Sequence, residues 1–131
     1  MIAPIREFTV QKWQSDWNKQ LRNKLHSIHS NVNGKINVGG LSRVEQVKLT
    51  RLRIGHSKLT HEYLLKGENP PKCQKCNVPL SVQHIMLDCQ RVRESRKKYL
   101  KNCSNLKNLF EATAKRDIIT FLKETRLFDR L

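Results

Sequence analysis

Residues 70–90 read PPKCQKCNVPLSVQHIMLDCQ and contain four side chains of metal-binding type, Cys73, Cys76, His84 and Cys89. Zn²⁺ prefers four ligands at the corners of a tetrahedron, and both thiolate and imidazole suit its intermediate softness. The pattern Cys-x2-Cys-x7-His-x4-Cys supplies all four ligands, which leaves no coordination position for water. We therefore predict one structural Zn²⁺ in this segment. Unconnected buried thiols are the alternative.

The residues between the ligands favour a compact site. The Pro70-Pro71 pair stiffens the approach to the cysteine turn, and Ser81 is suited to cap a short helix that carries His84 in its first turn. Cys89 lies five positions after His84, about 140° round an ideal α-helix. We therefore expect the chain to leave α geometry there, so that the Cys89 sulfur returns to the metal.

The chain before residue 41 favours one helix and a loop. Residues 31–40 contain three glycines and three asparagines and are predicted to form the loop. Residues 8–29 carry an apolar stripe at helical spacing, which predicts one helix with both tryptophans as core anchors. Base stacking by one tryptophan is the alternative. The stripe consists of Trp13, Trp17, Leu21, Leu25 and Ile28.

Capping signals predict two helices between residues 41 and 67. Ser42 and Glu45 form a capping-box pattern for a helix that ends near Gly55. Ser57 is suited to cap a shorter helix, which the Asn-Pro-Pro run at 69–71 should stop. The expected inward side chains of the two helices are Leu41, Val44, Leu49, Leu52, Leu59, Tyr63 and Leu64.

Helices are also predicted after the cysteine segment. Residues 90–102 favour a basic helix with a narrow apolar seam formed by Val92, Tyr99 and Leu100. Residues 106–131 favour one or two helices. The buried candidates in that last stretch are Ile118, Ile119, Phe121, Leu122, Leu127 and Phe128.

These signals predict a mainly α fold, a small helical domain with the zinc-binding CCHC loop at its centre. We assign residues 1–7 to an N-terminal extension and residues 8–131 to a single helical domain, with the zinc-binding element at 70–90. Cys103 has no partner histidine nearby and is expected to be a small core residue rather than a fifth ligand.

The charge of the chain favours a polyanionic partner. Its 26 Lys and Arg outnumber its 11 Asp and Glu, for a formal net charge of +15. Nucleic acid is the first candidate and an anionic membrane surface the second. No apolar run approaches the roughly 18 residues of a transmembrane helix, and the N-terminus lacks the apolar stretch of a signal peptide. We expect an intracellular protein, nuclear or cytoplasmic, with no membrane partner.

No constellation in the sequence favours catalysis. His56 and His61 have no acidic partner at motif spacing, so local packing or hydrogen bonding is the better interpretation. Gly-rich phosphate loops, nucleophile elbows and paired carboxylates are all missing from the sequence. We therefore expect that the chain is not an enzyme.

Two stretches together resemble a known protein segment. The run 51–61, RLRIGHSKLTH, leads into LLKGENPP at 64–71 and then into the cysteine–histidine pattern. This order resembles the C-terminal tail of non-LTR retrotransposon polyproteins, which follows the reverse transcriptase and RNase H regions. The entry Trp13-x3-Trp17 and the closing stretch 119–128 are similar to the same tail, although the loop 31–40 lacks the tryptophan that such tails often carry.

The resemblance implies a zinc-knuckle-like element that handles RNA or DNA, with Cys73, Cys76, His84 and Cys89 as matching ligands. The cysteine loop contains no Trp, Tyr or Phe, so phosphate contacts are expected rather than sequence-specific base recognition. A structural domain that docks on a reverse transcriptase or RNase H region encoded elsewhere is the alternative. The candidate nucleic-acid contacts are Arg51, Arg53, Lys58, Lys72, Lys75, Arg91, Arg93, Arg96, Lys97, Lys98 and Lys101.

Overall fold

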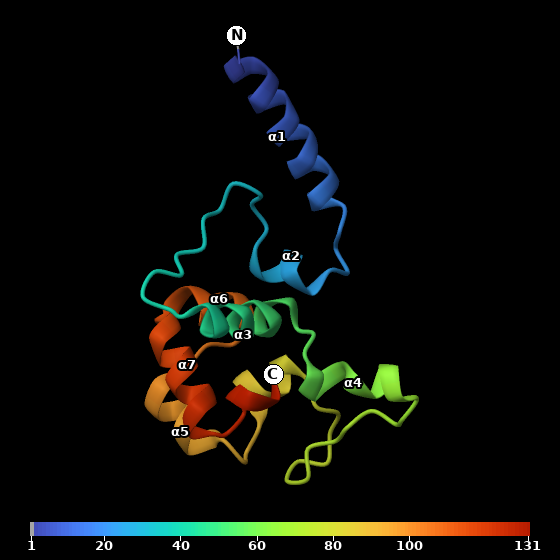
Figure 1. Cartoon of the computed structure of the whole chain (residues 1–131), viewed down its shortest axis with the longest axis vertical. Helices are drawn as coiled ribbons and strands as arrows, with labels where there is room; N and C mark the ends of the chain where they lie inside the picture. The colour runs from blue at the N-terminus through green and yellow to red at the C-terminus, as the bar shows by residue number, and fades with distance from the viewer. Residues whose placement is uncertain (1) are drawn as a thin grey trace. The chain divides into compact units, whose positions relative to one another are not determined.

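The chain is mainly helical, as Figure 1 shows. The computed structural model describes residues 2–131, with side chains from Pro4 onward. This part of the chain contains no β-strand, only an isolated antiparallel bridge between Lys72 and Pro79. The predicted fold class, a small helical domain with a cysteine–histidine cluster, is confirmed.

The backbone forms two compact units, Met1–Asn37 and Val38–Leu131. The boundary predicted at residue 7 lies within the first helix, α1 (Ile2–Asn18), so the described part of the predicted extension is helical. The assignment of residues 8–131 to one domain stays a prediction. In the part of the chain that the structure covers, no helix combines the length and the apolar character needed to cross a membrane.

The single helix predicted over 8–29 is wrong. The chain turns after α1, and α2 spans Lys24–Ile28. The side chain of Asn23 accepts a hydrogen bond from the Leu25 N–H (2.9 Å) and so caps the second helix. Because the helix is interrupted, the apolar stripe does not cover one continuous face, and Trp13 and Leu21 are 58% and 80% exposed.

The two helices predicted between residues 41 and 67 are present as α3 (Arg43–Ile54) and α4 (Lys58–Lys66). The capping box of Ser42 and Glu45 is confirmed, and α3 ends at Gly55 in the left-handed conformation. Gly67, also left-handed, ends α4 before the prolines do. Of the predicted inward side chains, Val44 and Leu64 are exposed instead, because their sides of α3 and α4 face solvent.

Four short elements follow the cysteine segment: α5 (Arg93–Tyr99), α6 (Leu106–Ala112), α7 (Lys115–Glu124) and the 3₁₀ helix η2 (Phe128–Arg130). The basic helix predicted over 90–102 is thus shorter than expected. In Figure 1, α7 lies beside α5 and α3. It supplies much of the core through the predicted Ile118, Ile119, Phe121 and Leu122, and Leu127 is also buried, while Phe128 is half-buried.

An ion-pair network joins α3 to α7 around the nearly buried Glu45. Its carboxylate accepts hydrogen bonds from Lys123 (2.9 Å), Arg116 (3.2 Å) and the Ser42 N–H (2.8 Å). The bond from Lys123, followed by the backbone bond from Ser42, lowers the pKa of Glu45 to about 2. Glu45 therefore has two roles: it completes the capping box of α3, and its ion pairs join α3 to α7.

Candidate metal centre

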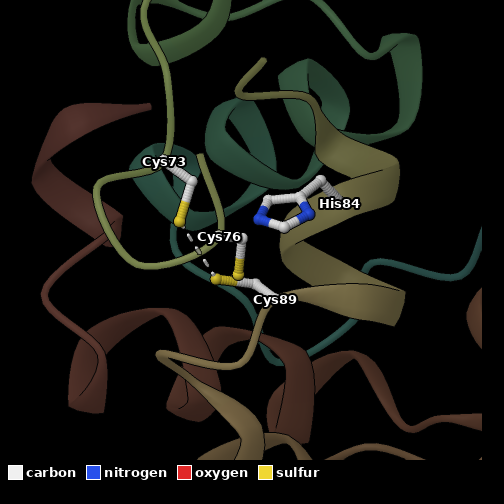
Figure 2. A group of neighbouring side chains, drawn as sticks. All are labelled: Cys73, Cys76, His84 and Cys89. Atoms are coloured by element: carbon white, nitrogen blue, oxygen red, sulfur yellow. Dashed lines mark hydrogen bonds between the residues drawn. The ribbon is translucent and has the colours of Figure 1, made fainter. Parts of the chain in front are cut away.

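The first two ligands lie in a tight turn between residues 71 and 80. The Cys73 N–H donates to the Val78 carbonyl (2.8 Å), and the Asn77 N–H donates back to the Cys73 carbonyl (2.7 Å). Asn77 adopts a left-handed φ of 55°, which asparagine tolerates better than most residues. The turn aims the sulfurs of Cys73 and Cys76 toward the same space, as Figure 2 shows.

The other two ligands flank an unusual helical turn. Ser81 accepts a hydrogen bond from the His84 N–H (3.0 Å), which confirms the predicted cap. His84–Asp88 then form a single π-helical turn, η1, and the Cys89 N–H donates to the His84 carbonyl (2.7 Å), five residues back. The predicted departure from α geometry is confirmed, and it returns Cys89 to the side of His84.

The four side chains meet at one point (Figure 2). Their potential ligand atoms all lie within 4.8 Å of one another. The sulfurs of Cys73 and Cys89 are 3.7 Å apart, close to the roughly 3.8 Å edge of a tetrahedron with Zn–S bonds of about 2.3 Å. A disulfide would need a separation of about 2.05 Å. The geometry is therefore that of a metal site, with all four cysteines as thiols.

The Nε2 atom of His84 shows whether the cluster suits a zinc ion. His84 is buried, and its Nε2 has no hydrogen-bond partner among the described residues. A buried imidazole nitrogen without a partner is costly, and ligation by a metal removes that cost. Three thiolates and one imidazole form a set that closes a structural zinc site. The four residues are thus consistent with one structural Zn²⁺.

Backbone groups stabilise the thiolates. The backbone N–H of Cys76 and then the neighbouring His84 ring lower the pKa of Cys73 to about 6. Burial raises the pKa of Cys89 in the absence of metal. The Gln90 N–H donates to the Cys76 sulfur (3.4 Å). Three thiolates around Zn²⁺ would give the site a net charge of −1, which N–H donors such as that of Gln90 would partly offset.

Arg96 supports the site from α5. Its guanidinium donates to the Cys89 carbonyl (2.8 Å) and, less closely, to the Ile85 carbonyl (3.4 Å). These bonds hold the end of η1 against the basic helix. The sequence had suggested a nucleic-acid contact for Arg96, and its seven-residue distance from Cys89 was the only signal of this supporting position.

Two other predicted nucleic-acid contacts, Arg51 and Arg53, are half-buried. Arg51 donates to the Leu131 backbone oxygen (3.0 Å). Arg53 is half-buried, and burial lowers its pKa. The remaining candidates are exposed on the second unit: Lys58, Lys72, Lys75, Arg91, Arg93, Lys97, Lys98 and Lys101.

The other cysteine and the paired histidines lie outside the cluster of four ligands. Cys103 is half-buried. The rings of His56 and His61 stack with their centroids 4.0 Å apart, and Thr60 Oγ1 lies 2.6 Å from His61 Nδ1. These are local packing and hydrogen-bonding contacts of the kind that the sequence favoured.

No family model, curated protein or solved structure matches this chain. The chain is therefore described by its own fold and metal centre. The chain is a small helical domain whose Cys₃His cluster is consistent with one structural zinc.

Proposed function

We propose that this chain is a nucleic-acid-binding module built on a structural zinc, that it binds mainly through phosphate contacts, and that it derives from the C-terminal tail of a non-LTR retrotransposon polyprotein. The observation that carries the binding role is a basic hollow of about 510 Å³ alongside α5. The motifs 51–61 and 64–89, which resemble that tail, support the origin.

Exposed cationic side chains are prominent in the lining of the hollow. Arg93 and Lys97 lie one turn apart on α5, so both occupy one side of the helix. Lys101 follows the end of the helix, and Asp117 is the carboxylate that also lines the hollow. Concentrated positive charge around a concave surface favours a phosphodiester backbone, because each neutralised phosphate releases bound counterions.

The zinc would act by holding the basic surface in place. The bond from Arg96 to the Cys89 carbonyl joins the last metal ligand to α5. Because all four coordination positions belong to protein side chains, the metal suits a structural role better than a catalytic one. Binding rather than catalysis is therefore the proposed activity.

The test is a titration of the zinc-loaded chain with single-stranded RNA and with duplex DNA over a range of salt concentrations. We expect steep salt dependence, with a logarithmic slope of about −0.7 for each phosphate contacted on a single strand. Lys97→Gln should lower the size of that slope by about 0.7. Lys107→Gln, at an exposed lysine outside the hollow, is the matched control. Failure to bind either nucleic acid at low salt would refute the proposal.

A docking role is the second candidate, and α1 favours it. Ile5, Phe8 and Trp13 are large apolar side chains that remain exposed on this helix. Exposed apolar groups on one element are typical of an interaction surface. A reverse transcriptase or RNase H region is the proposed partner. Phe8→Ser with Trp13→Ser should abolish co-elution with such a region in size-exclusion chromatography, whereas unchanged co-elution would count against this role.

A further inference from the structure

A second hollow lies directly beside the metal centre. It has a volume of about 230 Å³ and is lined by both Cys73 and Cys89. Its apolar wall includes the buried Ile85 and Val92 and the half-buried Leu80. We call this hollow the zinc-side cleft. It is separate in its lining from the basic hollow alongside α5.

The rim of the zinc-side cleft is cationic and comes from three parts of the chain. Lys72 precedes the cysteine turn, Arg91 follows the last ligand, and Arg130 belongs to η2. All three side chains are exposed. Gln74, inside the cysteine turn, adds an amide with both a donor and an acceptor. The cleft thus combines an apolar interior with positive charge and one hydrogen-bonding group at its edge.

The size and charge of the cleft select its occupant. Sites for drug-sized ligands start at roughly 300 Å³, so a cleft of about 230 Å³ accommodates only a small group. The zinc centre beside it would carry a net charge of −1, which disfavours a phosphate in the interior and tolerates a neutral ring. Arginine guanidinium planes can stack on a base where no aromatic side chain is present. A neutral heterocycle inside the cleft, with an attached phosphate at the rim, fits the small volume, the negative zinc centre and the cationic rim.

We propose that the zinc-side cleft binds one unstacked nucleobase of a single-stranded nucleic acid, with the adjoining phosphates on Lys72, Arg91 and Arg130. This inference rests on the proposed nucleic-acid binding and deepens it. It assigns the site beside the zinc to a base, whereas the hollow alongside α5 serves the backbone. It also explains how a metal loop without aromatic residues would distinguish single strands from duplexes, whose bases are already stacked.

The experiment compares two fluorescent 12-residue strands by anisotropy, using the full zinc-loaded chain. One strand is oligouridine and the other has abasic sugars throughout, so that both carry the same phosphates. We expect the strand with bases to bind on the order of tenfold more tightly, since one stacked base contributes a factor of that size. Leu80→Lys places a charged chain in the cleft and should reduce the ratio of the two affinities to about one. Leu65→Lys is the matched control, because Leu65 is 91% exposed and does not line the cleft.

The outcomes separate the two proposals. If neither strand binds, the proposed function and this inference both fail. If both strands bind the wild-type chain equally, phosphate binding stands and the base site is refuted. An equal effect of Leu80→Lys and Leu65→Lys also refutes the site. Should Leu80→Lys lose its zinc, Gln74→Ala replaces it, because the Gln74 amide is the hydrogen-bonding group of the cleft, and Gln83→Ala, at an exposed glutamine outside the cleft, is its control. Gln74→Ala must then lower the ratio, and an unchanged ratio overturns the inference.

Discussion

Replacement of a single ligand gives the most direct test of the metal centre. Cys76 is half-buried, and its sulfur accepts the Gln90 N–H. Structural zinc sites in small domains bind with roughly 10–16 kcal/mol. If four ligands share this free energy about equally, each contributes roughly 3 kcal/mol. Cys76→Ser should therefore weaken zinc binding by a factor of about 150.

The binding free energy of a structural zinc, roughly 10–16 kcal/mol, is comparable to the total free energy of unfolding of a typical domain, about 5–15 kcal/mol. Removal of zinc should consequently unfold the second unit, because it leaves the buried Cys73, His84 and Cys89 side chains without their common partner.

The assay is competition with a chromogenic chelator, followed by circular dichroism of the metal-free chain. The purified chain should contain one zinc per molecule by elemental analysis. Cys103→Ser is the matched control, because Cys103 is also half-buried but lies outside the cluster of ligands. The reasoning is refuted if the metal-free chain keeps its helical signal and a cooperative thermal transition. Equal zinc affinities for the two serine variants would refute it as well.

Three further predictions concern the surroundings of the site and the core. Arg96→Met removes the bonds to the Cys89 and Ile85 carbonyls and should weaken zinc binding about tenfold in the same competition assay, whereas Lys97→Met should not. Glu45→Gln should lower the melting temperature at neutral pH. The folded-state pKa of Glu45 is lowered to about 2 from 4.5. The stability that the ionised Glu45 carboxylate contributes is therefore complete above pH 4.5 and disappears as the pH falls toward 2. The difference in melting temperature between the wild-type chain and Glu45→Gln should narrow over that range. A constant difference would contradict this assignment. Phe121→Ala empties a fully buried position (0% exposed) and should cost about 3–5 kcal/mol in urea unfolding of the zinc-loaded chain, while a loss below about 1 kcal/mol would show that the core is not packed as described.

The metal centre was the part most completely predicted from sequence, because its signals are local. The four ligands fall within 17 consecutive positions, from Cys73 to Cys89, and the angular offset of Cys89 was enough to anticipate a turn outside α geometry. The capping box at Ser42 was equally local and equally well predicted. In both cases the hydrogen-bonding groups and their partners are near neighbours in the chain.

The first helix was mispredicted because apolar spacing indicates which face a helix would bury, but it does not indicate where the helix ends. The spacing from Trp13 through Leu25 is helical, but Asn23 offers a side-chain cap that begins a new helix within that span. The preference of asparagine for N-cap positions is the sequence signal for this break. The network around Glu45 carried no such signal, since Arg116 and Lys123 lie 71 and 78 residues away in sequence.

The π-helical turn makes the spacing of the ligands sensitive to chain length. An i→i+5 bond accommodates one more residue between His84 and Cys89 than an α-helical bond would. Deletion of a single residue there would favour an ordinary α turn, and an insertion would carry the Cys89 sulfur about 100° further round the axis. Substitutions at the exposed Asp88 leave this count unchanged. Among sequences descended from a common ancestor, the number of residues in this turn should thus be retained even where their identities have diverged.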